Sequence, residues 1–152
     1  MRRIIACVLV VVAVVACSRV PITGRRQLNL LSEGEMMSMS LTAYQDFLKE
    51  NAALPPSDQR VQKVRRIGDE LSRAATKYLT EHGASERVAG FQWEFNVVDD
   101  ATVNAWCMPG GKVVVNSGLI LKSDQWSEIQ GVLAHEIAHV TLRHHVRGVI
   151  NQ

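Results

Sequence analysis

Apolar residues recur at helical spacing in two stretches of the first half of the chain. The first begins at Ser32-Glu-Gly-Glu35, which has the form of a capping box, and runs to residue 50 or 51. Its apolar positions are Met36, Met39, Leu41, Tyr44, Phe47 and Leu48. After Pro55-Pro56 a second helix is predicted to begin at Ser57 or Asp58. Its predicted buried positions are Val61, Val64, Ile67, Leu71 and Ala74. The first half therefore predicts two amphipathic helices.

In the middle of the chain, apolar residues occur at every second position, as in a half-buried strand. Residues 91–97 alternate strictly, which predicts a core face and a solvent face. The predicted core face is Phe91, Trp93, Phe95 and Val97, and the predicted solvent face is Gln92, Glu94 and Asn96. Residues 105–108 and 113–115 are apolar and flank Pro109-Gly-Gly-Lys112, which predicts a hairpin. A short turn of helix is expected around residues 119–121.

The last predicted helix begins at Ser123 or Asp124 and has two different faces. Its apolar residues fall within a sector of roughly 80°, which is predicted to pack on the core. They are Trp126, Ile129, Leu133, Ile137 and Val140. Gly131 lies in the interior of this helix, where glycine is less favourable than alanine by about 1 kcal/mol. We therefore expect a close neighbour at Gly131, plausibly a strand of the sheet.

The other face of this helix carries His135-Glu-Ile-Ala-His139, which predicts a metal site. Residues four apart on a helix differ by about 40° in direction, so His135 and His139 can bind one tetrahedral ion. Glu136, about 100° from His135, stands where a base would take a proton from water beside the ion. A purely structural zinc site is disfavoured because no cysteine pair is nearby to complete it. The motif thus predicts Zn²⁺ on His135 and His139, with Glu136 as the catalytic base.

The N-terminus has the pattern of an export signal. Met1-Arg-Arg is followed by 13 apolar residues, too few to span a bilayer as a mature helix. The run ends at Val14-Val-Ala-Cys17-Ser18, which resembles a bacterial lipobox. We predict a signal peptide at 1–16, lipidation at Cys17 and a tether over 17–31; ordinary cleavage or an uncleaved anchor is the alternative. The predicted location is the bacterial envelope, lipid-anchored and facing the periplasm, with Ser18 compatible with sorting to the outer membrane.

Composition and charge change this picture little. The chain has 152 residues, 47% of them hydrophobic, which suits one domain. The net charge is +2 and falls to zero without Arg2 and Arg3, and aromatic residues make up 5%, so no nucleic-acid partner is indicated. Cys7 would be removed with the leader and Cys17 would be acylated. Cys107 would then be the only thiol of the mature chain, so no internal disulfide is expected. Its apolar setting favours a packed thiol over a nucleophile.

Beyond the five-residue motif, three segments resemble zinc metallopeptidases of the HtpX and CAAX-prenyl-protease type, in particular their BepA-like periplasmic lipoprotein branch. Residues 21–28 resemble the mature start of such lipoproteins, 104–112 resemble the hairpin before the metal helix, and Arg143-His144 follow the motif as in the family. The resemblance implies an α+β zincin-like domain whose small antiparallel sheet or hairpin packs on the metal helix. It also implies unfolded or misassembled polypeptides as substrates, bound as an extra strand beside the hairpin.

In that family the third zinc ligand is a glutamate on a later helix, whereas this chain continues for only 13 residues after His139. We therefore expect residues 32–152 to be the N-terminal part of a domain truncated at its C-terminus. His145 stands where metzincins place a ligand, but Leu142 replaces their turn glycine. His144 is expected to pack in the core. The alternative function is a non-catalytic, peptide-binding or chaperone-like envelope lipoprotein; the oligomeric state is left open.

Overall fold

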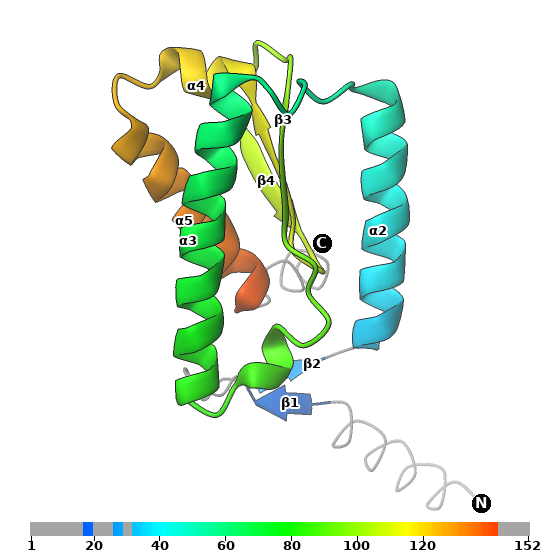
Figure 1. Cartoon of the computed structure of the whole chain (residues 1–152). Helices are drawn as coiled ribbons and strands as arrows, with labels where there is room; N and C mark the ends of the chain where they lie inside the picture. Colours follow the sequence, from blue (N-terminus) through cyan, green and yellow to red (C-terminus); the bar gives the residue numbers. More distant parts are fainter. Residues whose placement is uncertain (1–16, 20–25, 29–31, 143–152) are drawn as a thin grey trace, which may run out of the picture.

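The computed structural model describes residues 17–19, 26–28 and 32–142 (Figure 1). The helices are α2 (Glu33–Glu50), α3 (Gln59–Glu81), α4 (Ser117–Lys122) and α5 (Trp126–Thr141), with a 3₁₀ turn η1 at Ser85–Arg87. The strands are β1 (Cys17–Arg19), β2 (Arg26–Leu28), β3 (Glu94–Val98), β4 (Ala105–Met108) and β5 (Lys112–Asn116). The predicted α+β class is confirmed. The predictions for residues 1–16 and for Arg143, His144 and His145 lie outside the described residues.

Three of the strands form a sheet with the order β3-β5-β4. The predicted hairpin is confirmed, since β4 pairs antiparallel with β5 and Gly110 and Gly111 both have positive φ in the turn. The prediction of an antiparallel sheet was wrong, because β3 pairs parallel with β5 and the sheet is mixed. Alternation of apolar residues identifies a strand but not its neighbour, so this pairing is a product of the tertiary fold.

The sheet lies between helices, with α2 on one face and α3 and α5 on the other (Figure 1). Side chains of Phe95, Val97 and Val113 join α3 and α5 in the main hydrophobic core. On the opposite face, Val114 and Val98 form a smaller cluster with Tyr44 of α2. The metal helix α5 thus packs under one face of the sheet while α2 covers the other.

Gln92 is exposed, as predicted, but the cover by α2 overturns the prediction that Asn96 faces solvent. Asn96 is only 6% exposed and donates a hydrogen bond to the Tyr44 hydroxyl at 2.7 Å. Tyr44 in turn donates to Glu94 Oε1 at 2.9 Å, and Lys112 Nζ donates to Glu94 Oε2 at 3.1 Å. A buried polar group is tolerated when its hydrogen bonds are made, so a polar strand face can lie beneath a helix.

The predicted helices are present, but their exposed and buried positions differ in part. The capping box at Ser32 and Glu35 is confirmed. Met39 and Leu41 were predicted to be buried and are 62% and 42% exposed, because α2 packs mainly through Tyr44 and its neighbours. In α3 the predicted positions Val61, Val64 and Ile67 are buried, Leu71 is half-buried, and Ala74 is exposed while Ser72 is buried.

Two predictions for α5 were wrong. Its N-cap is Gln125, without a side-chain hydrogen bond, rather than Ser123 or Asp124. Gly131 has no neighbour within 4 Å of an added Cβ, so it is not a site of close packing. The close approach occurs instead at Gly68 of α3, where an added Cβ would collide with the ring of Phe95.

The predicted tether contains two short paired strands. β1 and β2 pair antiparallel, with Cys17 opposite Leu28 and Arg19 opposite Arg26. Among the residues that the structure describes, no helix is long and apolar enough to cross a bilayer.

Candidate metal centre

The predicted metal-binding pair lies on the last two turns of α5. The predicted buried positions Ile129, Leu133, Ile137 and Val140 are all in the core, with Trp126 half-buried beside them, so the helix presents the opposite face outward. On that outward face the two histidine rings lie 4.2 Å apart between centroids, and the Nε2 atoms of His135 and His139 are 2.8 Å apart. Both ring nitrogens are therefore directed at one point outside the helix.

Glu136 lies on the flank of this face that is nearer to β4. Its negative charge acts on Cys107 of β4, whose pKa is raised to about 12, first by burial and then by Glu136. A thiol with such a pKa stays protonated at neutral pH and is a poor nucleophile. The Cys107 thiol instead donates weakly to the Met108 carbonyl at 3.7 Å and packs against the main core, in line with the predicted packed thiol. Of these two side chains, Glu136 and not Cys107 thus carries charge on this flank at neutral pH.

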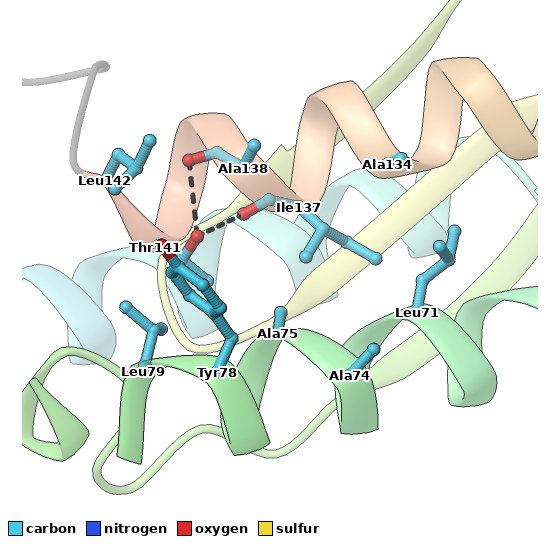
Figure 2. A pocket seen from close by; sticks show the side chains of 10 residues that line it. All are labelled: Leu71, Ala74, Ala75, Tyr78, Leu79, Ala134, Ile137, Ala138, Thr141 and Leu142. Carbon is cyan, nitrogen blue, oxygen red and sulfur yellow. Dashed lines mark hydrogen bonds between the residues drawn. The ribbon is translucent and has the colours of Figure 1, made fainter. Parts of the chain in front are cut away.

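The other flank of α5 borders an apolar groove of about 590 Å³ between α3 and α5 (Figure 2). Its walls are Leu71, Ala74, Ala75, Tyr78 and Leu79 of α3, with Ala134, Ile137, Ala138 and Thr141 of α5 and Leu142 after it. The Thr141 hydroxyl is bonded to the carbonyls of Ile137 and Ala138 and so satisfies the helix backbone. The metal-binding face thus has a carboxylate on one side and an apolar groove on the other.

The two outer edges of the sheet differ in their main-chain hydrogen bonding. On β3, the outward carbonyls are occupied: Arg65 Nε donates to Phe95 O at 3.1 Å, and Leu54 N donates to Val97 O at 2.7 Å. Ala53 also forms a bridge with Val98. This edge cannot accept a further strand without displacing those donors.

The edge of β4 is different. In an antiparallel pair, successive residues direct their backbone groups alternately toward the partner strand and away from it. Asn116 N donates to Asn104 O, so Trp106 and Met108 also form their backbone hydrogen bonds with β5. The N–H and C=O groups of Ala105 and Cys107 therefore point outward. Within the described part of the chain, no backbone partner meets these outward groups. Because β4 contacts α5, the open edge of the sheet lies beside the metal-binding helix. Sequence reasoning selected the hairpin but could not say which of its strands is at the edge.

The residues present fit a zinc ion in part. Two imidazole nitrogens directed at one point are nitrogen ligands of the kind that catalytic zinc sites use, and such sites have three protein ligands and an open position. Among the described residues, no group of three or more His, Cys, Asp or Glu side chains could hold a metal. The described residues thus offer two of the three protein ligands that such a site needs. The expected glutamate on a later helix, the role of Glu136 as the base and lipidation at Cys17 stay predictions.

A helix bearing HExxH, packed beneath a sheet whose open edge runs beside it, is the arrangement of a metal-dependent peptidase. Comparison with known proteins agrees: the chain belongs to peptidase family M48, whose model matches residues 58–152.

Curated relatives fall in two groups of named proteases. The chain is 37% identical to the mitochondrial metalloendopeptidase OMA1 of Arabidopsis thaliana over 66% of its length, and 31% identical to that of Schizosaccharomyces pombe over 82%. It is 30% identical to the beta-barrel assembly-enhancing protease of Escherichia coli (strain K12) over 87% of its length. The matches cover 18%, 34% and 25% of those proteins, so the chain spans at most about a third of each.

Proposed function

We propose that this chain forms the metal-binding part of a zinc-dependent endopeptidase that hydrolyses peptide bonds in proteins of the bacterial envelope. The observation that carries the proposal is the direction of the His135 and His139 Nε2 atoms toward one point, with Glu136 on the adjoining flank. Membership of family M48 and the protease names of its relatives support it.

His135 and His139 would hold the ion, together with a third ligand outside the described residues. When bound, Zn²⁺ supplies Lewis acidity that polarises a peptide carbonyl and lowers the pKa of water. Glu136 takes the proton from the attacking water and passes it to the leaving amine nitrogen as the C–N bond breaks. The nearness of Glu136 to Cys107 of β4 supports a proton transfer between the histidine pair and the open edge of the sheet.

The substrate main chain would bind as an added strand on β4. Outward N–H and C=O groups of Ala105 and Cys107 can form hydrogen bonds with an extended peptide. Such bonds read the main chain and not the side chains, which suits an enzyme for unfolded or misassembled polypeptides. The hairpin therefore holds the peptide while α5 supplies the reacting groups.

The location we propose is the bacterial envelope, with the chain anchored by lipid at Cys17 and facing the periplasm at the outer membrane. The lipobox-like sequence motivates the anchor, and the similarity to a beta-barrel assembly-enhancing protease supports the compartment. Cells fed radioactive palmitate should label the wild-type protein and not Cys17→Ala. Equal labelling of the two would remove the anchor at this residue.

The central experiment compares Glu136→Gln with Glu128→Gln, a matched change at an exposed position two turns earlier in α5. We expect Glu136→Gln to lower cleavage of casein by about 10²- to 10⁴-fold, the usual contribution of a general base, while zinc content stays at the wild-type value. Glu128→Gln should cleave at the wild-type rate. His135→Ala should lose zinc.

Equal cleavage by Glu136→Gln and the wild type would refute the proposed mechanism. The outcome in which the protein binds casein but no form cleaves it would favour the alternative, a peptide-binding envelope lipoprotein without hydrolytic activity. Two observations would then support that alternative. The described residues contain no group of three or more side chains that could hold a metal, and the edge of β4 is open to a peptide.

A further inference from the structure

An apolar surface lies along the open edge of β4 on the side of the sheet away from the metal helix. Side chains alternate along a strand, so Cys107 faces α5 whereas Trp106 and Met108 face α2. Phe47 of α2 packs edge-on against Trp106, with ring centroids 4.9 Å apart and planes at 86°. The edge strand is thus in contact with α2 through its side chains.

The same stripe of α2 continues along the strand. Ala43 and Phe47 are four residues apart, which places them within a sector of about 40° on the helix. At the hairpin end, the Ser40 hydroxyl donates to the Pro109 carbonyl at 2.8 Å, so this part of α2 lies against the turn. These two contacts place the part of α2 from Ser40 to Phe47 alongside β4.

We call the shelf the surface formed by Ala43, Phe47, Trp106 and Met108. Ala43 is exposed and the other three are half-buried, so the shelf is partly open to solvent. It contains no ionisable side chain. The nearest charged pair, Glu94 with Lys112, lies beneath Tyr44 and is satisfied by its own hydrogen bonds.

A strand that pairs with the outward groups of Ala105 and Cys107 would continue the pleat of the sheet. Every second side chain of that strand would point to the α5 side, and the side chains between them would point to the α2 side. The latter would lie over the shelf. Methionine side chains adapt to different apolar partners, so such a surface can accept many apolar residues.

We propose that the shelf is a specificity surface that selects extended polypeptides with apolar side chains at every second position. The inference rests on the proposed function, because it places the substrate strand on β4. It adds a side-chain preference to main-chain binding. The preferred substrate class is therefore an unfolded segment that alternates apolar and polar residues, and not an unfolded segment of any composition.

The test measures peptide binding to the full chain carrying Glu136→Gln, so that no turnover is needed. Two fluorescent peptides of equal length and identical composition are compared by anisotropy: one alternates Val or Leu with Ser or Thr, and the other groups its apolar residues in one block. We expect the alternating peptide to bind about tenfold more tightly, the change produced by burying roughly 55 Å² of apolar surface.

Ala43→Gln should reduce this preference to nearly equal binding, because it places an amide on the shelf. Leu41→Gln is the matched control: it makes the same kind of change on α2, on the other side of Tyr44, at a position that is 42% exposed. It should keep the wild-type preference. Phe47→Leu, which keeps an apolar side chain, should retain most of it, and circular dichroism establishes that each variant is folded.

Equal binding of the two peptides to the parent protein would overturn the inference, and so would an equal loss of preference in Leu41→Gln and Ala43→Gln. These results are distinct from a failure of the proposed function. The binding preference is measured without hydrolysis, whereas the proposed function fails only in the cleavage comparison between Glu136→Gln and the wild type.

Discussion

Two glycines in helix interiors should respond in opposite ways to replacement by alanine. At Gly131 in α5, an added Cβ meets nothing within 4 Å. At Gly68 in α3, it would collide with Cδ1 and Cε1 of Phe95, a residue that is only 3% exposed. Both changes remove the same backbone freedom from the unfolded chain, so the pair isolates the effect of packing.

The magnitudes follow from these contacts. Gly131→Ala should raise the free energy of unfolding by about 1 kcal/mol, the difference in helix propensity. Gly68→Ala has the same gain, but the ring must move by roughly 1 Å in a packed core, at the upper end of the 1 to 3 kcal/mol typical of overpacking. The net change at Gly68 should be a loss of about 2 kcal/mol.

Urea unfolding of the metal-free chain, followed by circular dichroism, measures both changes without the added stability that a bound ion would give. With a slope of about 2 kcal/mol/M, the midpoint should rise by roughly 0.5 M for Gly131→Ala and fall by roughly 1 M for Gly68→Ala. A Gly68→Ala protein as stable as the wild type, or a Gly131→Ala protein that is less stable, would refute the packing described for these helices.

Two further predictions concern titratable groups. Burial raises the pKa of Glu94, but hydrogen bonds from Lys112 and Tyr44 outweigh it and hold the pKa below its usual 4.5. The stability that the ionised Glu94 contributes is present above pH 4.5 and is lost as the pH falls through the lowered pKa. In urea unfolding, the difference in free energy of unfolding between wild type and Lys112→Met should therefore narrow from pH 7 to about pH 3. A difference that stays constant over this range would contradict the lowered pKa of Glu94. At pH 8, a Cys107 pKa of about 12 should make its alkylation by iodoacetamide about three orders of magnitude slower than that of a free cysteine, as measured by mass spectrometry; equal labelling in the folded chain and in urea would contradict this burial.

Local patterns were sufficient for most of the helices and for the candidate site. The capping box at Ser32, the buried face of α5 and the His135 and His139 pair depend on residues three or four positions apart, and these spacings place side chains together on any α-helix. The hairpin was equally local, since two glycines in its turn allow the positive φ that it needs.

The predictions that failed depend on contacts between segments far apart in the sequence. Asn96 was predicted to face solvent and is buried because α2, some fifty residues earlier, covers it. Gly131 was predicted to have a close neighbour, yet the helix contact that requires a glycine is at Gly68. Neither the helix or strand propensity of a segment nor the spacing of its apolar residues tells which other segment will pack against it.

The sequence by itself determined that His135 and His139 share one face of a helix, with Glu136 about 100° round from His135, because helical geometry follows from spacing alone. Only the tertiary structure decided that β5 lies between β3 and β4, that Arg65 and Leu54 occupy the β3 edge, and that the β4 edge stays open beside α5. The physical reason is that strand pairing and helix packing join residues through space, and many partners satisfy the same alternating pattern.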